Sequence, residues 1–470
     1  MTMRSSSPLS AVSHPSRRQA IALFASAAST AASLFGAGRV WAQSDLPAAS
    51  DLLRPEDGWM EEAKRLVRHV QDVYWQPDRG HYVTPRRYGG TVPVDNDGDR
   101  FVGHTLWSWC EALRMLTSVA ALEPERWSKD IAEVFVGLER YYDPERKVYN
   151  AWLQYPGNVD SYSDDNAWLI MGLCEATRAL NDPRFADRAN EVMEGYVSTE
   201  WRDDDGPLGM RWGFRPDGGP RHNQRAAISA STSAVAALEL AELGYHVDEN
   251  RDRARKYLEW VEATCVDDEG LVQDGLQPGL GEDGGWGIET TRWSYNTGLF
   301  IIGNLLLHKA TGDEAALARA TRSADAAIDR EGLLWDPTVT DPARRHLRDN
   351  TFFASHLLEA LVMASEHLGD DRYRDEAERE AAFMFTYLRD PEDGLYFRSL
   401  QLWRIDEQRF DQFRKSFAGA FDEGELKFDP NAEERASRGR DGDRPVVKTL
   451  LASAAVARAY ASLGSRHGVD

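Results

Sequence analysis

Two adjacent carboxylates, Asp164 and Asp165, open a long apolar segment, and aromatic residues flank them in the stretch SYSDDNAW at positions 161–168. Neighbouring residues at a helix start project roughly 100° apart, so the two carboxyl groups can stand on either side of one bond. Like charges held this close favour keeping a proton on one of them. One group can then protonate a leaving oxygen while the other attacks an anomeric carbon or activates water. The pattern therefore indicates cleavage of glycosidic bonds.

A purely structural role is the alternative for the same pair. The first turn of a helix favours negative charge, and Ser163 has the side chain of an N-cap residue. The segment from Trp168 to Leu180 is apolar around most of its circumference, which predicts a buried helix rather than an amphipathic one. Both roles therefore place the carboxylates at the start of an inner helix.

The elements that would position this pair recur along the chain. A similar turn lies at positions 80, 147, 206, 270, 332 and 394. It contains charged residues and, in most cases, glycine, and an aromatic or apolar residue follows it. These turns are about 60 residues apart, and each lies between a polar amphipathic helix and a more apolar one. We expect the polar helices near 57–74, 125–142, 183–197, 250–264, 313–328 and 371–388, and the apolar helices near 103–116, 164–180, 228–243, 295–309, 351–365 and 446–463.

Six helical hairpins, each with a polar outer and an apolar inner helix, can close into a ring. We therefore predict an all-α fold, an (α/α)6 toroid over residues 55–465, with the N-termini of parallel inner helices on one rim. An open solenoid of six units is the alternative. A charged insertion at about 398–445 interrupts the last unit and would form a lid, a rim extension or a disordered loop.

The segments that enter the inner helices are rich in aromatic and polar side chains, which in the ring would converge on one cleft. Such rings can stack on the apolar faces of a sugar, whose hydroxyl groups need both donors and acceptors. Each aromatic residue by itself is better explained by a place in the core, and it is their convergence on one rim that favours a binding surface. The substrate-binding candidates are Trp107, Tyr162, Asn166, Trp212, Arg225, Trp293, Tyr295, Asn296 and Asn350.

Two of these segments resemble the motifs of a known family. YSDDNAW at 162–168 is similar to the Asp-Asp-x-Ala-Trp signature of glycoside hydrolase family 76, and WSYNTG at 293–298 is similar to its Tyr-Asn-Gln-Gly. The resemblance implies an (α/α)6 enzyme of the α-1,6-mannanase type that acts by a retaining mechanism without metal or cofactor. It makes Asp164 the nucleophile and Asp165 the acid/base. The chain departs from the family at Thr297, where Gln is usual, and at Arg225-Ala226, where Lys-Asn is usual.

Two other functions fit a toroid with this composition. A sugar epimerase of the N-acylglucosamine 2-epimerase type would use His308 and His356 for proton transfer. A glycan-binding toroid would need no catalytic residue at all. The acidic run Asp95–Asp99 hints at calcium, but its glycine is in the wrong place for an EF-hand, so a solvated turn is the better interpretation and we expect no metal.

The formal net charge of −22 argues against nucleic acid or an anionic membrane as a partner. We expect the mature protein to be a monomer that acts on a poly- or oligosaccharide. The three cysteines, Cys110, Cys174 and Cys265, lie far apart without metal-ligand spacing, which favours buried free thiols.

Residues 1–42 have the pattern of an export signal. They contain SRRQ at 16–19, a modestly apolar run from 20 to 38, and the small-x-small site VWA that ends at Ala42. The paired arginines predict the twin-arginine route, a short linker at 43–54, and a periplasmic or extracellular location. The run is too weakly hydrophobic to anchor the chain in a membrane.

Overall fold

The computed structural model describes residues 52–83, 105–153, 159–214, 223–421, 426, 428 and 448–465. The predicted leader, the linker up to residue 51, the acidic run Asp95–Asp99 and most of 422–447 lie outside the described residues. In the part of the chain that the structure describes, no helix is long and apolar enough to cross a membrane.

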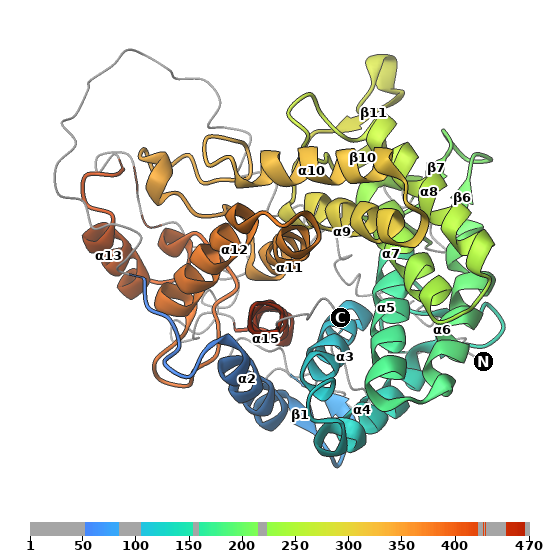
Figure 1. Cartoon of the computed structure of the whole chain (residues 1–470), viewed down its shortest axis with the longest axis horizontal. Coiled ribbons are helices and arrows are strands. Elements are labelled where there is room, and N and C mark those ends of the chain that lie inside the picture. Colours follow the sequence, from blue (N-terminus) through green and yellow to red (C-terminus); the bar gives the residue numbers. More distant parts are fainter. Residues whose placement is uncertain are drawn as a thin grey trace, which may run out of the picture.

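The described helices form two concentric layers around one axis (Figure 1). The inner helices are α3 (Leu106–Ala120), α5 (Ser163–Leu180), α7 (Ala227–Glu242), α9 (Ser294–Thr311), α11 (Thr351–Leu368) and α15 (Leu450–Gly464). The outer helices are α2 (Trp59–Tyr74), α4 (Pro124–Leu138), α6 (Pro183–Gly195), α8 (Val247–Thr264), α10 (Glu314–Ile328) and α12 (Asp371–Phe383). Each inner helix contacts the next, and α15 contacts α3. The ring is closed, so the predicted (α/α)6 toroid is confirmed and the open solenoid is wrong.

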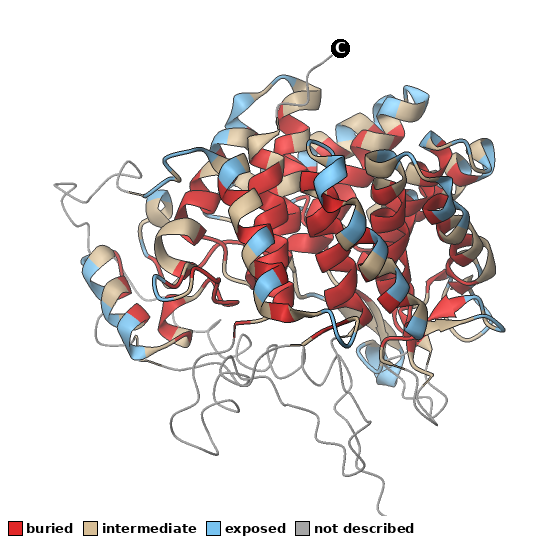
Figure 2. Ribbon diagram, turned by 90° about the horizontal axis from the view of Figure 1, so that it is seen from below, coloured by how far each residue is buried: buried red, intermediate tan, exposed pale blue. Residues whose placement is uncertain are grey.

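Hydrophobic pattern explains the layer that each helix occupies. Helix α7 is built mainly from alanine and serine and is buried on nearly every face, because small side chains allow neighbouring inner helices to approach closely. Helix α2 instead buries a single stripe that includes Leu66, Val67 and Val70. The buried residues accordingly gather in the middle of the ring and the exposed ones on its outside (Figure 2).

The pairing of outer with inner helices differs from the predicted hairpins. Each outer helix packs mainly on the inner helix that precedes it, such as α4 on α3 and α12 on α11, and α2 packs on α15. The connections from inner to outer helix are only a few residues long, which favours antiparallel neighbours, whereas the turn-bearing connections are long enough to reach the next inner helix. The contact of α2 with α15 joins the two ends of the ring.

Short strands lie on the long connections that lead to the inner helices. Three antiparallel hairpins occupy the first three predicted turns: β1 (Trp75–Gln76) with β2 (His81–Tyr82), β3 (Tyr142–Asp143) with β4 (Val148–Tyr149), and β6 (Trp201–Arg202) with β7 (Gly209–Met210). β5 (Ser161–Tyr162) pairs with β8 (Gly213–Phe214), and β9 (Arg225–Ala226), β10 (Gly275–Pro278) and β11 (Trp286–Glu289) form a three-stranded sheet. These pairings tie together the segments that enter α5, α7 and α9.

Part of the charged insertion is folded. It contains α13 (Glu407–Ser416), which ends against the outer layer through Phe417. The Phe417 ring lies 6.0 Å from the imidazole of His346 and 6.4 Å from the ring of Phe383 at the end of α12. Residues 398–421 therefore form a folded extension beside the ring, whereas most of the remaining insertion lies outside the described residues.

Candidate active site

Asp164 and Asp165 occupy the first turn of α5 and are almost completely shielded, with 1% and 0% of their surfaces exposed. The Asp164 carboxylate accepts a hydrogen bond from the backbone N–H of Asp165 at 3.1 Å and another from the indole N–H of Trp212 at 3.4 Å. The position at a helix N-terminus stabilises negative charge. The structure therefore holds one carboxylate of the pair in a defined orientation.

The start of α5 is held by contacts with a distant segment rather than by the predicted cap. Ser163 is the first residue of the helix, and its hydroxyl donates to the carbonyl oxygen of Arg211 at 2.6 Å. Its backbone N–H donates to the carbonyl oxygen of Trp212 at 2.9 Å. The prediction of Ser163 as N-cap is wrong, because its hydroxyl is used to bind the segment before α7.

Asn166 has a positioning role in this structure. Its side-chain oxygen accepts from the Tyr149 N–H at 2.9 Å, and its amide nitrogen donates to the carbonyl oxygens of Tyr149 and Tyr162 at 3.0 and 2.9 Å. The residue is fully buried. Asn166 was predicted as a substrate ligand, but the structure uses its amide to tie the first turn of α5 to strand β4.

The guanidinium of Arg225 likewise forms hydrogen bonds within the protein. Its guanidinium donates to the carbonyl oxygens of Pro207 and Asn223 and to the carboxylate of Asp205, at 2.5 to 2.7 Å, and none of its surface is exposed. The prediction that Arg225 contacts substrate is therefore replaced by a structural role: it binds the β6–β7 turn to strand β9.

Five aromatic residues form an aromatic wall at the starts of three inner helices: Trp107 on α3, Trp293 and Tyr295 at α9, and Phe352 and Phe353 on α11. The Phe353 ring lies 4.1 Å from that of Tyr295 and 5.1 Å from that of Trp293. The Trp107 ring lies 5.2 Å from that of Phe352 and 6.0 Å from that of Phe353. Three predicted binding residues are thus brought together.

The two phenylalanines of the aromatic wall were missed in the sequence, although both directly follow Asn350 and Thr351 at a predicted helix start. Trp109, which lies in the same entering segment as Trp107, packs instead against both Trp75 and Tyr82. A helix turns by about 100° per residue, so residues two apart point to nearly opposite sides.

The remaining predicted residues surround the same rim. The Tyr162 ring packs 4.6 Å from that of Trp212. Asn296 is buried and donates to Asp274 at 3.4 Å, and Asn350 occupies the N-cap position of α11. The backbone carbonyl of Asp165 accepts a contact from the Cys110 thiol at 3.5 Å, which places the carboxylate pair beside α3, the helix that carries Trp107.

Asp349 adds a further carboxylate to the rim, between the starts of α9 and α11. It accepts two hydrogen bonds from Ser294, from the backbone N–H at 2.8 Å and from the hydroxyl at 2.6 Å. Burial raises the pKa of Asp349 to about 6, since withdrawal from water outweighs these two bonds. The rim therefore contains a carboxyl group that can change its charge in mildly acidic solution.

A closed double ring of helices with adjacent aspartates at one inner helix start is the arrangement expected from the resemblance noted in the sequence. The model of glycosyl hydrolase family 76 matches residues 58–381. The chain belongs to this family. Membership of this family supports the predicted glycoside hydrolase activity on a carbohydrate substrate.

The chain is also similar to several known proteins. The chain is 30% identical over 425 residues to the meiotically up-regulated gene 191 protein of Schizosaccharomyces pombe, an alignment that covers 86% of this chain and 91% of that one. It is 22% identical over 313 residues to mannan endo-1,6-alpha-mannosidase DFG5 of Candida albicans, covering 60% and 68%. Its fold matches that of the α-1,6-mannanase GH76A of Salegentibacter sp. HEL1_6, solved with α-1,6-mannotriose, with a TM-score of 0.61, 19% identity and 86% and 99% coverage.

Neither histidine of the epimerase alternative lies in the first turn of its helix, where the carboxylate pair lies on α5. His308 is in the last turn of α9, where its Nδ1 contacts Nε2 of His367 at 2.8 Å. His356 is only 1% exposed and stacks on Trp168 in the ring interior. Among the described residues, no group of three or more His, Cys, Asp and Glu side chains is arranged to hold a metal ion.

Proposed function

We propose that the chain is a retaining α-mannosidase that cleaves α-1,6-mannosidic bonds, with Asp164 as nucleophile and Asp165 as acid/base. The observation that carries this proposal is the buried pair of adjacent aspartates at the start of α5, beside Trp212 and Tyr162. It is supported by the Salegentibacter α-1,6-mannanase, whose inactive variant has two aspartates, adjacent in its numbering, replaced by asparagine. It is also supported by the name of the Candida relative.

In this mechanism the Asp164 carboxylate attacks the anomeric carbon while Asp165 gives its proton to the glycosidic oxygen, and the carbon–oxygen bond to the leaving sugar breaks. Asp165, now ionised, then removes a proton from water, and the water oxygen displaces Asp164 from the same carbon. The hydrogen bonds that Asp164 accepts from Trp212 and from its own helix start orient the attacking group. No cofactor is required by these steps.

The aromatic wall supports a poly- or oligosaccharide as substrate, since aromatic faces suit the apolar faces of sugar rings. The departure at Thr297 bears on packing rather than on ligand contact. Its hydroxyl accepts a hydrogen bond from the Val272 N–H at 3.1 Å, and the residue is fully buried.

The test is incubation of the purified mature chain with a panel of α-mannans of defined linkage and with other polysaccharides, followed by assay of new reducing ends and of the anomer first released. Selective release from α-1,6-mannan with retained configuration is expected. Interconversion of free monosaccharides would instead identify an epimerase, and glycan binding without turnover would identify a binding protein.

We also propose that the chain is exported by the twin-arginine route and acts in the periplasm or outside the cell. The support is the SRRQ motif at 16–19 and the small-x-small site that ends at Ala42. Fractionation of cells should find a chain that begins near Gln43 outside the cytoplasm. Replacement of both Arg17 and Arg18 by Lys should leave the full-length chain in the cytoplasm, and an unchanged distribution would contradict this proposal.

A further inference from the structure

A cavity of about 480 Å³ lies at the end of the ring opposite the carboxylate pair. All six inner helices contribute to it, from their middles and C-terminal halves, including Glu175 on α5 and Glu366 on α11. Glu175 follows Asp165 by ten residues on the same helix, which separates them by roughly 15 Å along the axis. Its volume is in the range of small-molecule sites. This far-end cavity is therefore distinct from the candidate active site.

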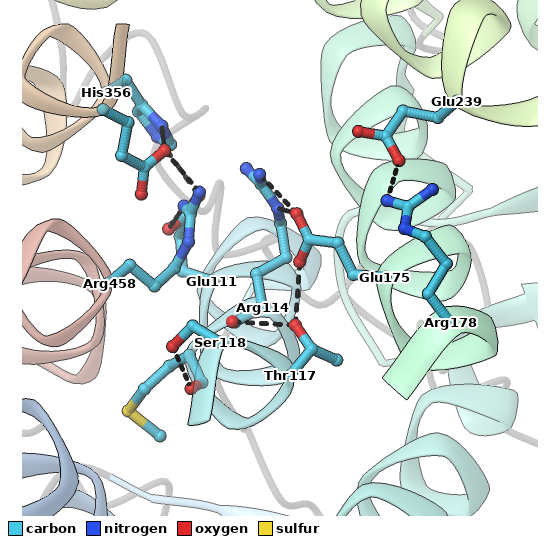
Figure 3. A network of polar contacts seen from close by, with 11 residues as sticks. Glu111, Arg114, Thr117, Ser118, Glu175, Arg178, Glu239, His356 and Arg458 are labelled. Carbon is cyan, nitrogen blue, oxygen red and sulfur yellow. Dashed lines mark hydrogen bonds and ion pairs between the residues drawn. The ribbon is translucent and has the colours of Figure 1, made fainter. Parts of the chain in front are cut away.

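The arginines of the far-end cavity are already paired (Figure 3). Arg114 donates to Glu175 at 2.9 and 2.7 Å, and Arg458 donates to Glu359 at 2.7 Å and to Glu111 at 2.5 Å. Arg178 is paired with Glu239. Among the described residues, Glu366 has no ion-pair partner. Among the described lining residues, the four glutamates therefore outnumber the three arginines by one.

The backbone adds to this negative balance. The inner helices direct their C-terminal ends towards the far-end cavity, where carbonyl oxygens carry partial negative charge. The pKa of Glu239 is raised by burial despite its bond to Arg178, with Glu175 adding repulsion, so negative charge is costly there. An anionic ligand is disfavoured, and a cation would relieve the repulsion.

The other lining groups define what kind of cation fits. Ser118 and Ser462 present hydroxyl groups, and Nη1 of Arg114 is a buried donor without a hydrogen-bond partner among the described residues. Met171 and Ile302 supply apolar surface. None of the described lining residues is aromatic, in contrast to the aromatic wall at the opposite rim. The unmatched groups are thus a carboxylate, which requires a positively charged donor, and a guanidinium N–H, which requires an oxygen acceptor.

We propose that the far-end cavity binds a small hydroxylated amine, of the amino alcohol or amino sugar class. Its ammonium group pairs with Glu366, and one of its hydroxyl oxygens accepts from Arg114. This site is separate from the proposed glycosidase chemistry, and its occupation does not depend on Asp164 or Asp165.

Titration calorimetry on the purified mature chain tests the proposal with matched probes at mildly acidic pH. Glucosamine carries both required groups, glucose lacks the amine, N-acetylglucosamine lacks the charge, and butylamine lacks the hydroxyl groups. Glucosamine should bind most tightly, with an affinity that falls as salt is added. Equal binding of glucose and glucosamine, or no binding of glucosamine, would overturn the proposal.

Variants locate the binding. Glu366→Gln should weaken glucosamine binding by at least about ten-fold, because a charged hydrogen bond is lost. Ser118→Leu should weaken it similarly by filling the cavity from α3 without changing the charge. Glu125→Gln, on the exposed side of α4, is the matched control and should bind as the unaltered chain does. Binding that is lost in Asp164→Asn but kept in Glu366→Gln would place the ligand in the active site and refute the far-end site.

Discussion

The indole of Trp168 lies face to face with the imidazole of His356, with ring centroids 4.3 Å apart and planes inclined by 22°. Trp168 follows Asp164 by four residues and therefore lies one turn below it on α5. The Arg114 guanidinium also lies over this indole, 5.4 Å from the ring centroid. His356 Nε2 is 3.2 Å from a carboxylate oxygen of Glu111. The base of the catalytic turn thus rests on a buried charged network.

We predict that His356→Leu destabilises the fold by about 2–4 kcal/mol, since it leaves a buried carboxylate with one fewer partner and removes the stacked ring. Urea unfolding measures this change. His308→Leu is the matched control: it is partly exposed at the end of α9 and should cost about 1 kcal/mol. Equal losses for the two variants would contradict the importance of the network.

We predict that Asp164→Asn lowers kcat by at least about 10³-fold while leaving the melting temperature within a few degrees, because an amide can still accept the helix-start hydrogen bond. Asp182→Asn is the control, since Asp182 caps α6 through the Arg184 N–H at 3.1 Å and lies on an outer helix. It should lose at most about 1 kcal/mol of stability and keep its activity. Normal turnover by Asp164→Asn would contradict the nucleophilic role of Asp164 and leave it only the role of stabilising the helix start.

Asp165→Asn should behave differently from Asp164→Asn. Substrates with good leaving groups need little protonation, so this variant should still form the glycosyl-enzyme from them, and azide should restore part of the turnover. Kinetics with activated and natural mannosides measure the contrast. If both variants had the same activities on activated and natural mannosides, the unequal roles of Asp164 and Asp165 would be contradicted.

We predict that Phe353→Leu lowers kcat/KM by about ten-fold, chiefly through KM, because the ring at the centre of the aromatic wall is lost. Phe135→Leu is the matched control, since this ring packs against Phe185 between the outer helices α4 and α6. It should alter stability without altering KM. An equal KM for both variants would show that the aromatic wall does not contribute to substrate binding.

Gly275 provides a test of how the rim is built. Its φ is +129°, and a Cβ atom there would lie 2.1 Å from the carbonyl oxygen of Arg225 on the neighbouring strand β9. Gly275→Ala should therefore cost more than about 3 kcal/mol and impair activity. Gly279 has a φ of +88°, but a Cβ atom added there would meet no atom within 4 Å. Gly279→Ala should therefore lower the free energy of unfolding by only about 1 kcal/mol. Thermal unfolding of the two variants decides the matter.

The raised pKa of Asp349 predicts a pH dependence of stability. The unfolded carboxyl group ionises near 3.8, whereas the folded one ionises at about 6, so the folded state holds its proton more tightly. The stability contributed by this group is fully present below pH 3.8 and is lost as the pH rises to about 6. Asp349→Asn should flatten this part of the curve of unfolding free energy against pH. Parallel curves for the two proteins would contradict the assignment.

Local patterns in the sequence determine much of this protein. The apolar periodicity separates inner from outer helices, and the turns near Gly80, Gly206 and Gly394 mark the long connections, because both signals depend only on neighbouring residues. The adjacent Asp164 and Asp165 identify the candidate catalytic turn for the same reason. The number of repeats then predicts a ring.

Only the tertiary structure decided which side chains remain available at the rim. Asn166 and Arg225 are of residue types that often bind ligands. Here the Asn166 amide donates to the carbonyl oxygen of Tyr149 and the Arg225 guanidinium to that of Pro207. Phe353 joins the aromatic wall only because α9 and α11 are neighbours in the closed ring. Hydrogen-bond saturation and ring packing depend on residues far apart in the chain, so no local pattern could determine them.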